Sequence, residues 1–497
     1  MTTTPDWVHH AVFYQIFPDR FSKGKGVAHS HLTFQPWSSK PTQQGYQGGN
    51  LQGIVDQLEN LIDLGVTALY PTPIFQSASN HRYHTDDYYT IDPLLGGHPA
   101  FKTLLAALKA TNVKLVLDGV FNHTGRGFFP FHDLVENGPD SPWVDWYRIE
   151  AWPISPYHPR KKPNYPCWFN HRALPKLNHD HPDVREFIMQ VGEYWVEQGI
   201  DGWRLDVPHE IHAEGFWQTF RHRIKTKNPE AYLVGEILGD AAHWLDGHQF
   251  DGVMNYLFRI FTLRFASGGH VDPAYRHSIC GHKITNLSAK GYGEKIQSLL
   301  QRYPWEHQLA QLNLLSSHDT PRVATLLQQD EARIRIAVFL LLTFPGAPCI
   351  YYGDEVGLLG GHDPDCRRTY PPRSEWDNHL RQYYQALISC RRAQAALRTG
   401  RYQVCYTDQQ TYVFARHLNQ ETVLGIVHRS TQPRTLRLDR SWFTCNHEHA
   451  DVHLLFGEAK MASTSVNSVI HLPAMACLLL KITHNGAKPS VGGANPL

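Results

Sequence analysis

The chain has 497 residues, enough for two or three domains around a large core. Its 47 basic and 46 acidic side chains nearly balance and form no basic block or stripe, so the charge pattern does not favour nucleic acid as a partner. No apolar run approaches the roughly 18 residues of a membrane span, and the N-terminus lacks the basic and apolar segments of a secretory signal. We therefore expect a cytoplasmic protein with no membrane contact and with a neutral or small partner.

Short apolar runs alternate with helical patterns from residue 11 to about residue 360, which is typical of repeated βα units. Eight of these runs are candidate strands, and eight βα units predict an α/β fold, the (β/α)8 TIM barrel. The candidate strands span residues 12–16, 66–70, 113–118, 202–206, 232–236, 251–255, 311–315 and 349–352.

Two segments depart from the barrel pattern. Residues 125–178 follow the third strand, are rich in Pro, Trp, Tyr and His, and predict an inserted subdomain that leans over the active face. After about residue 397, short alternating runs predict a C-terminal antiparallel β-domain. The expected division is barrel 1–124 and 179–396, insertion 125–178, β-domain 397–484 and flexible tail 485–497.

Cysteine and histidine usage gives no support for a metal centre. The eight cysteines are scattered without a C-x-x-C pair, which argues against a zinc site or a dense disulfide framework. Neither the pair His209 and His212 nor the pair His243 and His248 has the i, i+4 spacing of an H-E-x-x-H motif, and no third ligand is obvious near either pair. We expect no catalytic metal and no cofactor.

Three carboxylates end strand-like runs, namely Asp206, Glu236 and Asp319. A parallel barrel brings the C-terminal ends of its strands to one face, so residues distant in sequence can share a pocket. Most glycoside hydrolyses need one carboxylate as nucleophile and another as proton donor. We therefore predict a glycosidase pocket in which the carboxyl groups of Asp206 and Glu236 lie about 5–5.5 Å apart, the spacing of retaining enzymes.

Four segments in chain order resemble the signature segments of the α-amylase family of glycoside hydrolases. They are Asp-Gly-Val-Phe-Asn-His at 118–123, Gly-Trp-Arg-Leu-Asp at 202–206, Glu236, and Ser-His-Asp at 317–319. Residues 346–355 resemble the family's eighth-strand segment. Narrower segments resemble the neopullulanase, cyclomaltodextrinase and maltogenic amylase group, namely Leu-Pro-Lys-Leu-Asn at 174–178, residues 247–256 and residues 363–367.

The resemblance implies a role for each matched position. Asp206 would be the nucleophile that forms a glycosyl-enzyme, Glu236 the acid and then the base, and Asp319 a stabiliser of the distorted sugar. Arg204 would keep Asp206 ionised. The other implied substrate-binding residues are Tyr83, His123, His209, Trp244, His318, Asp363 and Arg367.

Plainer interpretations of these residues stay open. Strand-end carboxylates can cap helices or form ion pairs. Tyr83 and Trp244 can be packing residues, and Asp363 with Arg367 can be an ordinary surface ion pair.

The chain also departs from the group in several places. The extra N-terminal β-domain that builds the group's dimer is not found before the first strand, so we expect a monomer or an unusual dimer with a more open cleft. Lysines in residues 22–26, and Asn50 where relatives have Asp, oppose a first calcium site. A second calcium site, near Asn122 and Glu210, is left open. His84 and His209 replace the group's usual Asp and Asn, and His209 is expected to influence whether water or sugar accepts the glycosyl group.

The sequence thus predicts a retaining α-glucan hydrolase that cleaves α-1,4 bonds of maltooligosaccharides and cyclodextrins, with pullulan or starch as further candidates and with transglycosylation. An exo-acting α-glucosidase or maltodextrin glucosidase is the near alternative. A catalytically silent glucan-binding protein is the distant one. Cleavage of α-1,6 bonds is left open.

Overall fold

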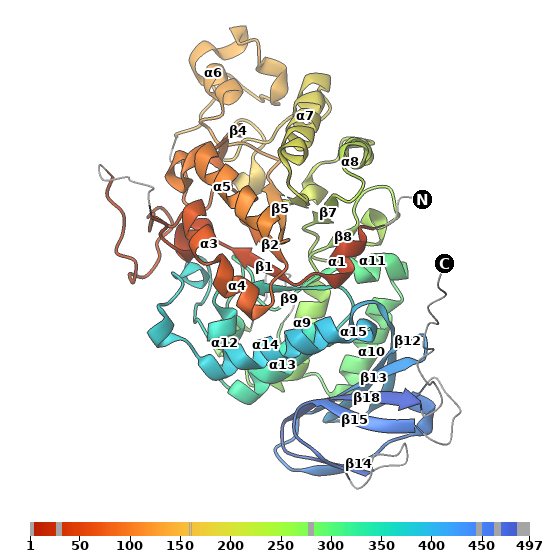
Figure 1. Cartoon of the computed structure of the whole chain (residues 1–497). Coiled ribbons are helices and arrows are strands. Elements are labelled where there is room, and N and C mark those ends of the chain that lie inside the picture. The colour runs from red at the N-terminus through yellow and green to blue at the C-terminus, as the bar shows by residue number, and fades with distance from the viewer. Residues whose placement is uncertain are drawn as a thin grey trace, which may run out of the picture.

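The computed structural model describes residues 4–25, 32–158, 160, 162–276, 283–443, 450–461 and 469–484 (Figure 1). The tail expected at 485–497 lies outside these residues, as do Cys280 and Cys445.

Eight parallel strands form one sheet in the order β8-β7-β6-β5-β2-β1-β10-β9. A parallel bridge between Met254 and Leu312 joins the two ends of this sheet, so the ring is closed. Each strand overlaps one of the eight runs expected from the sequence, which confirms the barrel. The strands are β1 Phe13–Ile16, β2 Ala68–Pro71, β5 Lys114–Gly119, β6 Gly202–Leu205, β7 Tyr232–Gly235, β8 Gly252–Val253, β9 Leu312–Leu314 and β10 Ala347–Tyr351.

Helices surround the barrel, and several of them begin or end at capping residues. In the helix Pro182–Gln198, for example, proline begins the first turn and Gly199 ends the helix with a φ of 106°. The α-helices are α1 Asp6–His10, α2 Pro18–Phe21, α3 Leu51–Asp56, α4 Leu58–Leu64, α5 Gly97–Ala110, α6 Phe129–Asn137, α7 Pro182–Gln198, α8 Phe216–Lys227, α9 Tyr256–Ser267, α10 Ala289–Leu300, α11 Trp305–Leu309, α12 Val323–Leu326, α13 Glu331–Thr343, α14 Asn378–Ala393 and α15 Ala395–Thr399. Among the described residues, no helix combines the length and the apolar character needed to cross a membrane.

The barrel core has an inner and an outer layer because its strands are buried on both faces. Phe13, Tyr70 and Tyr232 belong to the inner cluster. Trp7 on α1 packs against Phe13 and Tyr232, with ring centroids 5.8 and 6.0 Å apart. Helix α1 therefore covers the end of the barrel opposite the C-terminal ends of the strands.

The segment after β5 carries α6 and little other regular structure, and α6 lies at one extremity of the molecule (Figure 1). Isolated bridges connect His123 to Lys176 and Tyr147 to Leu177. The antiparallel pair β3 Phe75–Ser77 and β4 Thr85–Ile91 lies between β2 and α5 in the chain. Through the bridge of Lys176 to His123, the end of the insertion therefore returns to the loop that follows β5.

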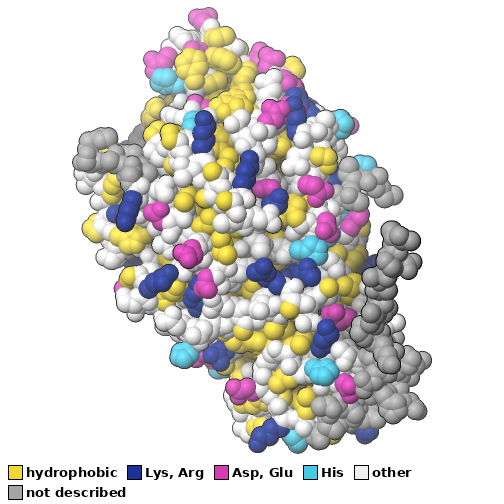
Figure 2. All heavy atoms as spheres, in the orientation of Figure 1, with side chains coloured by type: hydrophobic (Ala, Val, Ile, Leu, Met, Phe, Trp, Pro, Cys, Tyr) yellow, Lys and Arg dark blue, Asp and Glu magenta, His cyan; other side chains and the backbone are white. Residues whose placement is uncertain are grey.

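The C-terminal part is antiparallel, as expected, and forms a five-stranded and a three-stranded sheet. On the face in Figure 2, basic and acidic side chains are interspersed over the whole molecule. The boundaries of the insertion and of this C-terminal part stay predictions. The strands are β11 Arg401–Thr407, β12 Thr411–Leu418, β13 Glu421–His428, β14 Arg434–Arg437, β15 Ala450–Phe456, β16 Lys460–Met461, β17 Val469–Leu472 and β18 Ala476–His484.

Two buried arginines donate to backbone carbonyls near the end of α13, and Arg416 thereby joins the C-terminal part to the barrel. Arg391 on α14 donates to the carbonyls of Leu342 and Phe344 at 3.2 and 3.1 Å. Arg416 on β12 donates to the carbonyl of Thr343 at 2.7 Å. These carbonyls lie at and just beyond the C-terminal end of α13, where helical partners are lacking. Burial lowers the pKa of Arg391 to about 9.

Candidate active site

The three strand-end carboxylates lie at the same face of the barrel. Asp206 directly follows β6, Glu236 directly follows β7, and Asp319 lies in the loop after β9. Asp206 and Glu236 each keep 7% of their surface exposed. Both side chains are therefore shielded from most of the solvent, but each keeps a small surface that a substrate can contact.

Arg204 on β6 binds two of these carboxylates at once. Its Nη1 lies 2.9 Å from Asp206 Oδ1, and its Nη2 lies 2.7 Å from Glu236 Oε1. The contact with Glu236 is a close ion pair whose geometry is not that of an aligned hydrogen bond. Nη1 also lies 2.9 Å from Asp118 Oδ1. One buried guanidinium therefore holds three carboxylates together.

Burial and the excess of carboxylates over cations in this cluster raise the pKa values of Glu236 and Asp206. Burial raises the pKa of Glu236 to about 7; Arg204 opposes that shift, and the charge of Asp319 adds to it. Burial also raises the pKa of Asp206, and Arg204 is again the main opposing influence. Because one cation faces three carboxylates, the group titrates as a unit. The arrangement can therefore keep one carboxyl protonated near neutral pH while another is ionised.

The backbone after Asp206 is strained. Val207 has a φ of 36°, a conformation that is rare for a β-branched residue. Its N–H donates to Glu236 Oε2 at 3.2 Å. The turn thus orients the two carboxylates relative to each other.

Tyr83 joins this cluster through its hydroxyl. The hydroxyl lies 2.8 Å from Asp118 Oδ2 and 2.7 Å from His318 Nε2, and the ring stacks on His318 at 5.3 Å and 7°. Tyr70 donates to the same oxygen of Asp118 at 2.9 Å. The candidate residues did not include Asp118 or Tyr70, although Asp118 begins the 118–123 motif and could have been found there.

Asp319 has its own cationic neighbour. Arg367 Nη2 lies 3.3 Å from Asp319 Oδ1, and Arg367 Nη1 lies 2.9 Å from Asp363 Oδ1. His318 Nε2 lies 3.1 Å from Asp319 Oδ2. The Asp363–Arg367 pair is therefore connected to the third carboxylate and is not an isolated surface pair.

The remaining predicted residues lie at different distances from this network. His123 is buried, stacks on Trp168 at 5.7 Å, and has a pKa that burial lowers to about 3. The side chain of His209 is 41% exposed, and its Nε2 lies 3.9 Å from Glu210 Oε1. Trp244 stacks on Phe250 at 5.6 Å and 8°, which agrees with its packing interpretation. Trp168 belongs to the insertion and was not among the candidates.

Asn50 and Glu210, which mark the two calcium positions expected from the resemblance, contact other groups. Asn50 Oδ1 accepts from the N–H groups of Gly53 and Gly24, so it serves as the cap of α3. Lys176 Nζ lies 2.8 Å from Glu210 Oε2 and neutralises that carboxylate. Within the described ranges, no group of three or more His, Cys, Asp or Glu side chains is placed to hold a metal ion. Asn122 Oδ1 is buried and has no hydrogen-bond partner among the described residues, so the second position stays open.

Comparison with known proteins agrees with this geometry. The family model for the α-amylase catalytic domain matches residues 15–387. The native form of the Nostoc punctiforme debranching enzyme has 51% sequence identity and a TM-score of 0.89, over 97% of this chain and 99% of that one. A Bacillus cyclomaltodextrinase is 40% identical over 87% of this chain and 75% of its own length. An intracellular maltogenic amylase of Bacillus subtilis is 35% identical over 89% and 73%.

The chain therefore belongs to the α-amylase family of glycoside hydrolases. Within the family it is similar to the group that contains cyclomaltodextrinases, neopullulanases and maltogenic amylases, as residues 174–178 indicated.

Proposed function

We propose that this enzyme is a retaining α-glucan hydrolase in which Asp206 is the nucleophile and Glu236 the acid and base. The observation that carries the proposal is Arg204, which lies 2.9 Å from Asp206 and 2.7 Å from Glu236. We also propose that the two carboxyl groups lie about 5–5.5 Å apart, the spacing of retaining glycosidases.

The reaction has two displacements. The ionised Asp206 attacks the anomeric carbon while Glu236 gives its proton to the departing glycosidic oxygen, so the carbon–oxygen bond breaks and a glycosyl-enzyme forms. Glu236, now ionised, takes a proton from water, and the resulting attack releases Asp206 and restores the α-configuration. A second sugar in place of water gives transglycosylation.

Asp319, His318 and Arg367 are proposed to hold hydroxyls of the distorted sugar, with Asp363 supporting Arg367. Tyr83 and His123 are proposed to form the walls of this subsite. His209 and Trp244 are proposed for the leaving-group side. Support comes from the contact of Arg367 with Asp319 at 3.3 Å and from the stacking of Tyr83 on His318.

The proposed substrates are maltooligosaccharides and cyclodextrins, cleaved at α-1,4 bonds, in a cytoplasmic enzyme that needs no calcium. A second candidate activity is cleavage of α-1,6 branch points. The observation that favours it is the likeness to the Nostoc debranching enzyme over nearly the full length of both chains. Pullulan and amylopectin contain both linkages, and β-cyclodextrin contains the α-1,4 linkage alone.

Two variants test the roles of the carboxylates. α-Maltosyl fluoride carries a leaving group that needs no proton, so Glu236→Gln should still release fluoride in a single-turnover burst and should not cleave maltoheptaose. Asp206→Asn should release none. Glu197→Gln, an exposed position on α7, is the control and should match the parent enzyme. Equal fluoride release by the two site variants would contradict the assigned roles of nucleophile and acid.

Product analysis tests the stereochemistry and the alternatives. NMR of the first products from maltoheptaose should show the α-anomer, and an initial β-anomer would contradict retention. Glucose as the single early product would favour the exo-acting α-glucosidase. Side-by-side time courses with β-cyclodextrin and pullulan should show which linkage is preferred.

A further inference from the structure

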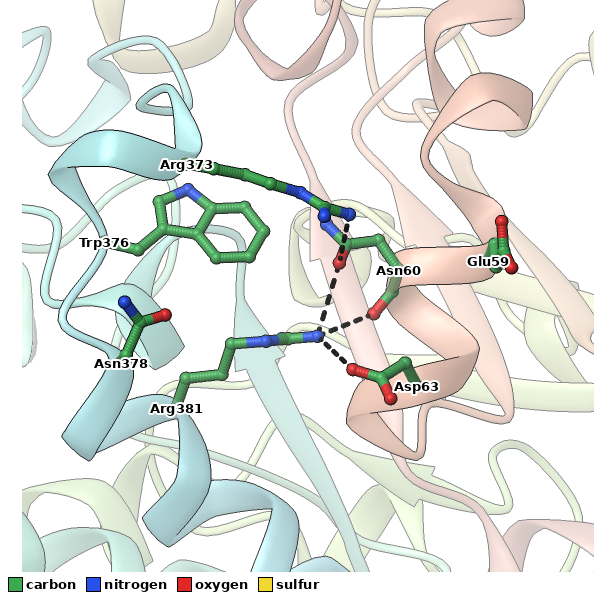
Figure 3. A pocket seen from close by; sticks show the side chains of 7 residues that line it. All are labelled: Glu59, Asn60, Asp63, Arg373, Trp376, Asn378 and Arg381. Atoms are coloured by element: carbon green, nitrogen blue, oxygen red, sulfur yellow. Dashed lines mark hydrogen bonds and ion pairs between the residues drawn. The ribbon is translucent and has the colours of Figure 1, made fainter.

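A cavity lies between α4 and the segment that begins α14, and it is lined by none of the residues of the carboxylate cluster (Figure 3). Its volume is about 640 Å³, within the roughly 300–1,000 Å³ of small-molecule sites. Helix α4 contributes Glu59, Asn60 and Asp63 to its walls. None of these residues takes part in the carboxylate cluster.

The opposite wall is built around Trp376. Arg373 and Arg381 lie on either side of the indole in Figure 3, with their Cζ atoms 5.5 and 5.2 Å from the ring centroid. Both Nη2 atoms reach Asn60 Oδ1 at 3.4 Å. The indole Nε1 donates to the carbonyl of Pro371 at 3.0 Å, so its polar atom is satisfied. Trp376 thus orders two guanidinium groups at the cavity.

Arg381 is held more firmly than Arg373. Its Nη2 donates to Asp63 Oδ2 at 2.9 Å and to the carbonyl of Asn60 at 3.0 Å, and the residue is 6% exposed. Arg373 is exposed and has the weaker 3.4 Å contact with Asn60. One donor is therefore fixed in advance and the other can adjust to a ligand, which reduces the entropy cost of binding.

The charges of the cavity select against ions. Arg381 is paired with the carboxylate of Asp63, Glu59 adds a second carboxylate to the lining on the side away from the arginines, and the carboxamides of Asn60 and Asn378 complete the polar lining (Figure 3). An anion would meet the carboxylates, and a cation would meet the arginines. Sugar hydroxyls both donate and accept hydrogen bonds, so they can use all three kinds of group. A neutral ligand rich in hydroxyls fits this lining best.

We propose that this cavity binds a glucosyl unit of an α-glucan chain, as a second site separate from the catalytic pocket. The inference rests on the proposed α-glucan substrate and extends it. A long or branched glucan can occupy both sites at once, which raises its effective concentration at the catalytic pocket. A short oligosaccharide cannot span them and gains nothing from the second site.

Kinetics with long and short substrates test the proposal. Trp376→Ala should raise the KM for amylopectin about fivefold or more, and should leave kcat/KM for maltotriose within about twofold of the parent. Trp305→Ala is the matched control, because Trp305 is also a partly exposed tryptophan beneath an arginine, 4.9 Å from Arg401. It should change neither value. An equal loss on both substrates would overturn the proposal.

Direct binding gives an independent readout. Calorimetric titration of the Glu236→Gln enzyme with maltoheptaose should fit two sites, and adding Glu59→Lys should leave one. Glu59 is exposed on α4, so this substitution does not disturb the core. A single site in the Glu236→Gln enzyme, or displacement of the second maltoheptaose by inorganic phosphate, would reject a glucan site. A parent enzyme that hydrolyses no α-glucan would instead reject the proposed function.

Discussion

The hydroxyl of Tyr83 lies 2.8 Å from Asp118 Oδ2, and this contact ties the wall of the proposed sugar site to the carboxylate cluster. Asp118 also accepts from Arg204 Nη1 at 2.9 Å. Tyr83 is therefore more than an aromatic surface, because its hydroxyl fixes the ring parallel to His318.

Removal of that hydroxyl tests this connection. Tyr83→Phe keeps the ring and loses hydrogen bonds to Asp118 and His318, so kcat/KM for maltotriose should fall about tenfold, the equivalent of about 1.4 kcal/mol. Tyr83→Ala also loses the stacked ring and should fall further. Tyr194→Phe on α7 is the control. A phenylalanine variant with parental activity would assign Tyr83 a stacking role alone.

The pKa of about 7 for Glu236 sets the expected pH profile. A general acid must be protonated, so kcat/KM for maltotriose should fall as pH rises through about 7 and should be retained below it, down to the pH at which Asp206 takes up a proton. With α-maltosyl fluoride the single-turnover burst should lose this alkaline fall, because fluoride leaves without a proton. The same alkaline limb with both substrates would point to another group.

Arg367 should matter through the geometry of its guanidinium. Arg367→Lys keeps the positive charge but cannot contact Asp319 and Asp363 together, so kcat/KM should fall about tenfold or more. Arg368→Lys is the neighbouring control, because Arg368 pairs with Asp365 and not with Asp319. Similar losses in both variants would indicate a general effect on this loop.

Buried Arg391 should contribute to stability. Arg391→Ala leaves the carbonyls of Leu342 and Phe344 buried without this donor, so the free energy of unfolding in urea should fall by about 3 kcal/mol. Arg392→Ala, an exposed neighbour on α14, should change it by less than about 0.5 kcal/mol. Equal urea midpoints for the two variants would contradict the proposed contribution of Arg391 to stability.

The barrel was predictable because its strands are buried on both faces and therefore appear as apolar runs, each followed by helical periodicity. The positions of Asp206, Glu236 and Asp319 followed from the same fact, since strand ends meet at one face. Sequence spacing contains no distances between side chains, so the shared contact of Arg204 with Asp118, Asp206 and Glu236 needed the structure.

Other site residues were harder to foresee. Trp168 lies in the insertion, where no periodicity indicates which side chain returns to the strand ends, and it stacks on His123. Trp244 and Phe250 form a stacked pair that sequence cannot separate from a substrate-binding surface. Long segments without regular structure depend on tertiary contacts, which a single sequence does not reveal.

The ring of strands is thinnest where β8 contributes two residues and one bridge, Met254 to Leu312, completes the closure. Local breathing of the barrel should begin there, so the amides of residues 252–254 should exchange with deuterium before those of β5 or β6. Arg204 Nε lies 3.4 Å from Met254 Sδ, so each such opening loosens the support of the guanidinium that the carboxylates share. The rate of deuterium uptake at residues 252–254 thus reports how rigidly Arg204 and its carboxylates are held.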